Sequence, residues 1–335
     1  MARTGARHPA FLAVDVEPNG FQLGDEGPAA WSGFSAMAAF VDELREELLA
    51  TTGVAPTIGW YYRLDPQIAA AFGRPDYAVR TFASLVEAQR RRGDYFGIHV
   101  HPVRHDDAAG AWVHDFADPE WTTECVRHSA AVFADTFGTA VRRHRFGAGF
   151  LSDAVVAECE RLGIDVDLTL EPAARPPDNL IRSGSDTTPI VGALGDYSAT
   201  PRFAYRPDVH DFRVAASRDR RQITLVPLST TNHLRIDTPR WKRSAKRVLR
   251  GPEPATMLYP SVALESSDLF WKLALWELEA MDRPYLSFAL RTDDPGSDCG
   301  RNVRRLFAAL PRHPIARQLR FVDPLEVVGT LLPTR

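Results

Sequence analysis

The sequence FLAVDVEP at residues 11–18 is an apolar run that ends in two carboxylates. Such a run predicts a β-strand, and because side chains alternate along a strand, Asp15 and Glu17 should lie on one face near its carboxyl end. Chemistry in parallel α/β folds is assembled at the carboxyl ends of strands. We therefore expect the pair to belong to a functional site, with capping or ion pairing as the alternative.

Further runs of the same kind predict strands at residues 57–62, 95–101, 143–150, 166–171, 223–228, 285–290 and 320–322. Helical spacing of apolar residues lies between them, at 35–50, 77–92, 119–137, 152–162, 268–281, 302–310 and 324–332. This alternation predicts an α/β fold with a parallel sheet, either a barrel or an open doubly wound sheet. A glycine-rich phosphate loop is absent, which disfavours a nucleotide-binding fold.

The composition favours one large domain over residues 1–335. Within it, residues 172–221 are rich in Pro, Gly, Ser and Asp, and we interpret them as an irregular insertion facing the substrate. The net charge of −3 gives no general attraction for nucleic acid or anionic membranes. No run reaches the roughly 18–20 apolar residues of a membrane span, and the first ten residues lack the apolar core of a signal peptide, so we expect a cytoplasmic protein.

A histidine pair ends the run at residues 95–101. His99 and His101 are two apart, so their imidazoles should project to one side of an extended strand and could chelate one metal ion. His105 follows four residues later. It is a candidate third ligand, a candidate proton shuttle, or a loop histidine without a role.

The run at 143–150 carries Arg143 and Arg145, followed by small residues that let a ligand approach the backbone. An arginine beside a metal and carboxylates would orient a carboxylate or hold substrate oxygens, and Arg145 fits this role better than Arg143. Trp60 and Trp112 are candidates for stacking on a sugar, although tryptophans of this kind are more often packing residues.

The order of DVE at 15–17, HVHP at 99–102 and RFGAG at 145–149 resembles the polysaccharide deacetylase (NodB-like) superfamily, in a variant branch with DxE and HxHP motifs. TIGWYYRLDPQI at 57–68, LGIDVDL at 162–168 and ITLVP at 223–227 extend the resemblance over most of the chain. It implies a distorted (β/α) barrel and a divalent-metal deacetylase.

Carried over by residue, the resemblance implies that Asp15 is the general base, that Arg145 orients it, and that Glu17, His99 and His101 bind the metal. The roles of Asp15 and Glu17 could be exchanged. In the commoner form of the family the two histidines are four apart, so His101 with His105 is the alternative imidazole pair.

The sequence departs from the family where a histidine is expected as general acid, because Arg291 stands there. Arginine does not donate a proton near neutral pH. Either His105 or His233 protonates the leaving amine, or ordinary deacetylation does not occur. Arg291 would then hold an anionic substrate group or an oxyanion, or simply pair with Asp293 or Asp294.

These features predict a metal-dependent hydrolase that removes an N-acyl group from a sugar, glycolipid or natural-product intermediate. The expected cofactor is zinc, with cobalt, nickel, manganese and iron as alternatives. A relative that binds a saccharide without turnover, and iron and oxygen chemistry at the same site, are the alternative functions. The expected partner is a small molecule or glycan, and the sequence does not define the oligomeric state.

Overall fold

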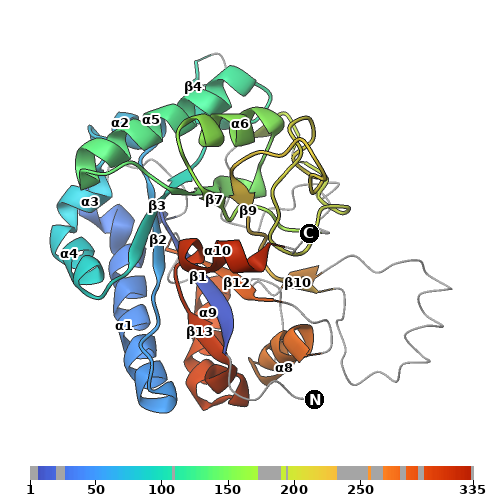
Figure 1. Cartoon of the computed structure of the whole chain (residues 1–335). Coiled ribbons are helices and arrows are strands. Elements are labelled where there is room, and N and C mark those ends of the chain that lie inside the picture. Colours follow the sequence, from blue (N-terminus) through green and yellow to red (C-terminus); the bar gives the residue numbers. More distant parts are fainter. Residues whose placement is uncertain are drawn as a thin grey trace.

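The computed structural model describes residues 7–19, 27–107, 110–172, 190–193, 195–231, 256–257, 267–279, 284–292 and 298–332. Their main feature is a curled, all-parallel sheet with strand order β12-β1-β2-β3-β6-β7-β9, and β13 pairs with the first residues of β1 (Figure 1). The strands are β1 His8–Val16, β2 Gly59–Arg63, β3 Tyr95–Val100, β6 Arg143–Phe146, β7 Val166–Asp167, β9 Thr224–Leu225, β12 Leu286–Arg291 and β13 Leu319–Phe321. The predicted distorted (β/α) barrel is confirmed.

The chain after β9 connects the two edges of this sheet. The Leu228 amide donates to the Leu170 carbonyl at 2.8 Å, and the Ser229 amide donates to the Ser287 carbonyl at 3.0 Å. The Ser287 amide in turn donates to Ser229 Oγ at 2.9 Å. A few irregular hydrogen bonds, instead of a regular ladder, therefore close the barrel between β9 and β12.

Both faces of the sheet are buried, which explains why its strands read as nearly continuous apolar runs. Phe11 and Ala13 of β1 belong to the inner cluster, together with Tyr61 of β2. Their neighbours Leu12 and Val14 belong to the larger cluster between the sheet and the helices. Asp15 and Glu17 share the inward parity of Phe11 and Ala13, so β1 delivers both carboxylates to the barrel mouth.

The helices are α1 Ser32–Thr52, α2 Pro66–Phe72, α3 Tyr77–Thr81, α4 Ala83–Arg91, α5 Pro119–Phe137, α6 Asp153–Arg161, α8 Ser267–Glu279, α9 Asp298–Ala309 and α10 Pro324–Leu331. In Figure 1, α1 and α4 lie on one side of the barrel, α5 and α6 cross near its top, and α8 and α9 lie near its lower end. None of the helices in the described part of the chain is long and apolar enough to cross a membrane.

Several local predictions need correction. The predicted helix at 77–92 is two helices, because Phe82 leaves helical geometry at φ −109° and ψ 35°. The predicted strand at 143–150 ends at Phe146, where a 3-10 turn, Gly147–Gly149, follows. A hairpin of β4 Val103–Asp106 and β5 Ala111–Asp115, with β8 Ile190–Val191 beside β5, was not predicted.

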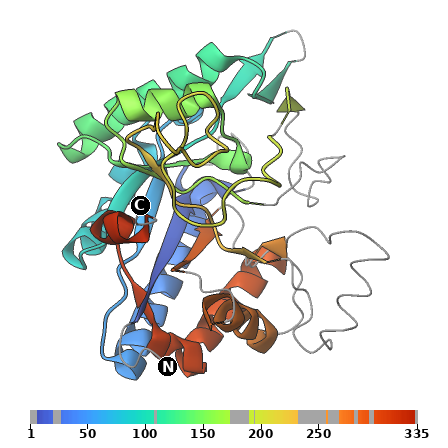
Figure 2. The ribbon, with the colours of Figure 1, turned by 45° about the vertical axis from the view of Figure 1, so that its right-hand side comes forward.

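The irregular segment predicted at 172–221 is described at 172, 190–193 and 195–221, whereas residues 173–189 and 194 lie outside the described residues. Tyr197 donates its hydroxyl to the Leu151 carbonyl at 3.2 Å, and the Phe212 amide donates to Asp153 Oδ1 at 2.8 Å. Figure 2 shows this segment beside α6. Its substrate-facing role stays a prediction.

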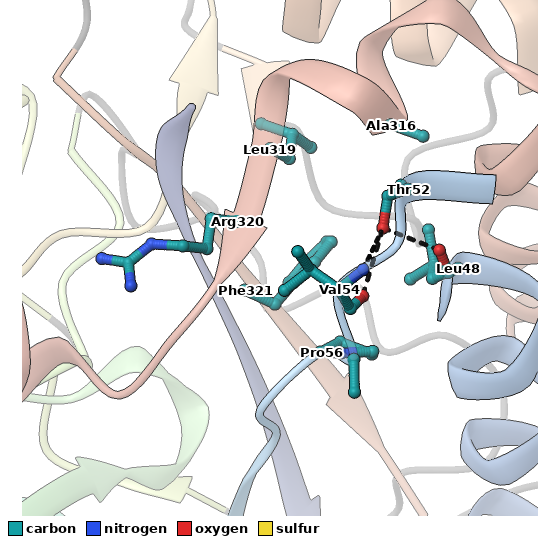
Figure 3. Close-up of a pocket in the computed structure, with 9 residues that line it drawn as sticks. Leu48, Thr52, Val54, Pro56, Ala316, Leu319, Arg320 and Phe321 are labelled. Carbon is teal, nitrogen blue, oxygen red and sulfur yellow. Dashed lines mark hydrogen bonds between the residues drawn. The ribbon is translucent and has the colours of Figure 1, made fainter. Parts of the chain in front are cut away.

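A small cavity lies at the amino-terminal end of the barrel (Figure 3). Leu48 and Thr52 of α1 line it, together with Pro56 and with Leu319 and Phe321 of β13. Its volume is about 10 Å³, roughly the space for one water molecule. It lies at the end of the strands opposite to Asp15 and Glu17, so it is packing space and no substrate site.

Asp94, just before β3, ties α1 to β2. Its carboxylate accepts two bonds of 2.8 Å from Arg45 Nη2, and it also accepts 3.0 Å bonds from the Ile58 amide and from Trp60 Nε1. Trp60 is therefore held in the outer core, with 1% of its surface exposed. It cannot stack on a substrate, which corrects one of the two sugar-stacking candidates.

We expect Asp94→Ala to lower the free energy of unfolding by about 3–5 kcal/mol, because it leaves the buried Arg45 guanidinium without its carboxylate. The matched control is Asp42→Ala, which removes a half-exposed partner of Arg92 and should cost about 0–1 kcal/mol. Urea unfolding followed by circular dichroism measures both. Equal losses in the two variants would contradict the anchoring role of Asp94.

Candidate metal centre

Thr292, directly after β12, fixes the end of β1. Its amide donates to the Asp15 carbonyl at 3.1 Å. Its hydroxyl accepts from the Glu17 amide at 2.9 Å and donates to the Glu17 carbonyl at 2.8 Å. The two acidic residues are thus held by backbone contacts across the parallel β1–β12 pair, in which Asp15 is opposite Arg291.

His99 lies near the end of β3, between β2 and β6, and His101 directly follows the strand. His99 is opposite Arg145 in the register of β3 and β6. Its Nδ1 lies 3.0 Å from the Arg145 carbonyl oxygen, which can only accept, so Nδ1 carries the proton and Nε2 presents a lone pair. This is the tautomer in which a metal-binding histidine is held by a backbone carbonyl.

Three buried atoms form a compact triangle at the barrel mouth. His99 Nε2 and His101 Nε2 are 3.0 Å apart, and Glu17 Oε2 lies 3.7 Å from the former and 3.4 Å from the latter. Ligands placed about 2.0–2.1 Å from a tetrahedral zinc ion are about 3.3 Å from one another. The triangle therefore fits a divalent ion, and among the described residues Glu17, His99 and His101 are the group that could hold one.

The Glu17 Oε2 atom gives independent support for a cation. It is buried, and none of the described residues donates a hydrogen bond of normal geometry to it. Unpaired buried carboxylate oxygens are costly, and a bound cation would remove that cost. The same ion would separate the facing Nε2 atoms, which otherwise point at each other.

Arg291 holds the other oxygen of this carboxylate. Its Nε donates to Glu17 Oε1 at 3.0 Å, and 35% of its side chain is exposed. Burial alone would raise the pKa of Glu17, but the Arg291 charge and the two imidazoles lower it well below its ordinary value. Glu17 is thus ionised near neutral pH. The alternative partners considered for Arg291, Asp293 and Asp294, lie outside the described residues.

The imidazole of His101 is neutral for a related reason. Burial and the nearby Arg63 charge lower the pKa of His101 well below its ordinary value, although Glu17 opposes them. Its backbone amide donates to Asp65 Oδ2 at 3.3 Å, and Asp65 is ion-paired with Arg63 at 2.8 Å. A neutral imidazole is the form that binds metal ions.

Arg145 connects this triangle to Asp15. Its Nε lies 2.8 and 2.9 Å from the two oxygens of Asp15, and its Nη1 donates to the Leu168 carbonyl at 2.7 Å. Asp15 Oδ1 lies 3.6 Å from His99 Nδ1. The carboxylate of Asp15 is thus fixed beside the triangle without being a member of it.

His105 lies elsewhere. It sits on β4, 43% of its side chain is exposed, and its Nδ1 pairs with Asp107 Oδ1 at 2.8 Å. Its ring packs against Trp112, with 5.4 Å between centroids. The structure therefore pairs His99, and not His105, with His101. A catalytic role for His105 stays a prediction.

Three features near this site escaped the sequence reasoning. Thr292 and Asp65 hold the ligand-bearing segments through backbone contacts, which no local pattern reveals. Glu171 ends the strand predicted at 166–171, just as Asp15 and Glu17 end the first strand, so its position could have marked it as a candidate site residue. A third imidazole, His114 of β5, also packs against His101, with 5.3 Å between ring centroids.

The chain was compared with known proteins. No protein-family model and no curated protein matches the sequence. Solved structures do match: a Mycobacterium smegmatis protein assigned as a polysaccharide deacetylase superposes with a TM-score of 0.51 at 10% identity, covering 99% of this chain and 92% of that one. A Pseudomonas aeruginosa PAO1 protein with the same assignment gives 0.51 at 9% identity, covering 97% and 90%.

The chain has the fold of the polysaccharide deacetylases. The Puue allantoinase shares it as well, with a TM-score of 0.50 at 10% identity, covering 98% of this chain and 91% of that one. At these identities the likeness shows the fold alone. The deacetylase fold places the ends of β1, β3 and β6 at one mouth, where the buried triangle and the Asp15–Arg145 pair are found.

Gly147, in the turn after β6, packs directly against the His101 imidazole of the triangle. A Cβ atom added to Gly147 would lie 2.1 Å from His101 Nε2. We therefore expect Gly147→Ala to displace this imidazole and to weaken zinc binding at least 10–100-fold, as seen when ligand orientation is lost. Isothermal titration with zinc measures the effect.

The control is Gly329→Ala in α10, where an added Cβ meets no atom within 4 Å. It should bind zinc like the unchanged protein. If Gly147→Ala folds normally and also keeps full zinc affinity, the ion is not held by His101 Nε2.

Proposed function

We propose that the protein is a metal-dependent hydrolase that removes an N-acyl group, most simply acetyl, from an amino sugar, a glycolipid or a natural-product intermediate. The observation that carries this proposal is the pairing of two different carboxylates at one mouth. Glu17 faces two imidazoles, whereas Asp15 is fixed by Arg145 just outside the triangle. The first arrangement suits a metal ligand and the second suits a base.

Glu17, His99 and His101 would hold the ion, and two nitrogen ligands with one carboxylate favour zinc. Bound there, a divalent ion supplies Lewis-acid chemistry, which lowers the pKa of water toward neutrality and polarises a carbonyl. The neutral His101 imidazole and the ionised Glu17 carboxylate are already in the protonation states that such an ion requires.

Asp15 is the residue placed to take the proton from the attacking water. Arg145 donates to both oxygens of Asp15, which fixes the orientation of the carboxylate for this task. Thr292 holds the Asp15 backbone from the other side. Asp15 is thus held by Arg145, and Glu17 is held by Arg291. This arrangement favours Asp15 as the base and Glu17 as the metal ligand over the reverse.

The substrate class follows by analogy. The matching structures from Mycobacterium smegmatis and Pseudomonas aeruginosa are assigned as polysaccharide deacetylases, and the resemblance of the DVE, HVHP and RFGAG motifs agrees with an amide-bearing sugar. One fold supports many chemistries, so an activity assay has to decide the substrate.

The first test measures metal content and acetate release together. We expect about one zinc ion per chain in the unchanged protein and its loss in both His99→Ala and His101→Ala, because each variant removes one of three ligands. His105→Ala is the matched control and should keep the ion. Acetate release from N-acetylated sugars should follow zinc content.

The outcomes separate the candidate functions. Bound metal with no acyl release, and no oxygen consumption, would support a saccharide-binding protein. Oxygen-dependent turnover with iron would support the oxidative alternative. Absence of bound metal would overturn the proposal.

A second prediction separates base from ligand. Asp15→Asn should keep zinc but lower kcat for deacetylation about 10²–10⁴-fold, since the amide cannot accept the proton. Glu17→Gln should instead lose zinc. Metal analysis and initial rates check both variants, and zinc loss in Asp15→Asn with retention in Glu17→Gln would show that the two roles are exchanged.

A further inference from the structure

Amide hydrolysis needs a proton donor for the leaving nitrogen, because an amine does not leave as an anion. Arg291 stands where the resemblance to the deacetylases leads us to expect a histidine, and its Nε donates to Glu17 Oε1 at 3.0 Å. Arginine stays charged and gives up no proton. His105 is half-exposed and paired with Asp107, and His233 lies outside the described residues. Another group near the triangle has to be considered.

Glu171 lies at the carboxyl end of the β7 segment, on the same mouth. The chain leading to it is anchored to the site, because the Leu168 carbonyl accepts from Arg145 Nη1 at 2.7 Å. It is also anchored to the closing segment, because the Leu170 carbonyl accepts from the Leu228 amide. The hydrogen bonds of Leu168 and Leu170 therefore fix the backbone that precedes Glu171 relative to the barrel mouth.

The Gly147–Gly149 turn lies against both the triangle and the Glu171 carboxyl. A Cβ on Gly147 would meet His101 Nε2 at 2.1 Å, and a Cβ on Gly149 would lie 3.6 Å from Glu171 Cδ. Two residues span at most about 7.6 Å between Cα atoms. The same short turn thus touches a candidate metal ligand at one end and the Glu171 carboxyl at the other.

The turn is held in an unusual conformation. Ala148 has φ 54°, the only positive φ outside glycine among the described residues. Backbone strain of this kind persists where the surroundings over-determine it, and it concentrates at functional sites. The strained backbone at Ala148 agrees with the close approach of Gly147 to His101 and of Gly149 to Glu171.

We propose that Glu171 is the general acid that protonates the leaving nitrogen. This inference rests on the proposed deacylation. As the carbon–nitrogen bond breaks, the electron pair of that bond goes to nitrogen and the carboxyl proton of Glu171 is transferred to it. The acyl group leaves as the carboxylic acid and the amine as the neutral product. Asp15 holds the proton taken from water, and proton exchange with solvent resets both residues.

The charges around Glu171 suit this task. Burial raises the pKa of Glu171, and the Asp15 charge adds to this effect, whereas the Arg145 and Arg291 charges oppose it. Tyr197 is a further titratable group near it among the described residues. A raised pKa suits a carboxyl group that has to hold a proton and donate it.

The experiment compares two substrates that differ in leaving group. Glu171→Gln keeps the shape of the side chain but has no acidic proton. With an N-acetylated amino sugar we expect kcat/KM to fall about 10²–10⁴-fold. With 4-nitrophenyl acetate, whose leaving group departs as an anion without protonation, we expect a fall of less than about tenfold. Zinc content should stay unchanged.

Two more variants complete the design. Glu171→Asp keeps a donor proton on a shorter side chain, and its amide activity should lie between those of the unchanged protein and Glu171→Gln. Glu120→Gln on α5, where 85% of the side chain is exposed, is the matched control and should behave like the unchanged protein.

The results distinguish this inference from the proposed function. If the unchanged protein hydrolyses the amide and Glu171→Gln does so equally well, the acid is another residue and the inference is overturned. An equal loss with both substrates would show that Glu171 supports the site without donating the proton, which also overturns it. If the zinc-loaded unchanged protein hydrolyses neither substrate, the proposed deacylation itself fails.

Discussion

Arg145 is the residue on which the arrangement of this barrel mouth depends. Its guanidinium donates to Asp15 of β1 and to the Leu168 carbonyl beyond β7, while its own carbonyl accepts a hydrogen bond from His99 Nδ1 of β3. One residue thereby orients the proposed base, sets the tautomer of a candidate metal ligand and holds the segment that leads to Glu171. A buried guanidinium needs such partners, so the site and the fold stabilise each other.

The structure gives Arg291 a different role from the general acid that the motif resemblance implies at this position. The Arg291 guanidinium donates a hydrogen bond to Glu17, the candidate metal ligand, and keeps that carboxylate ionised. The other carboxylate oxygen, Oε2, faces the histidines. Hydrogen bonds from outside the ligand set commonly orient metal-binding carboxylates in this way. For the proposed deacylation, the acid would then come from another strand end, and Glu171 occupies such a position.

Strand parity made the central residues predictable. Asp15 with Glu17, and His99 with His101, are two apart on strands whose ends face one mouth, so local sequence was sufficient to group them. The partner of Arg291 was not predictable, because it depends on the register between β1 and β12, which are far apart in the chain. The helix expected at 77–92 is interrupted at Phe82, whose backbone is not helical and whose ring packs against Phe34 of α1.

The central claim is that Glu17, His99 and His101 form one metal site. Anomalous diffraction from zinc-loaded crystals, recorded on both sides of the zinc absorption edge, tests it directly. The account predicts a single strong peak between the two Nε2 atoms and Glu17 Oε2, with Asp15 held by Arg145 outside the coordination sphere. A peak at His105, or coordination by Asp15 in place of Glu17, would contradict the account.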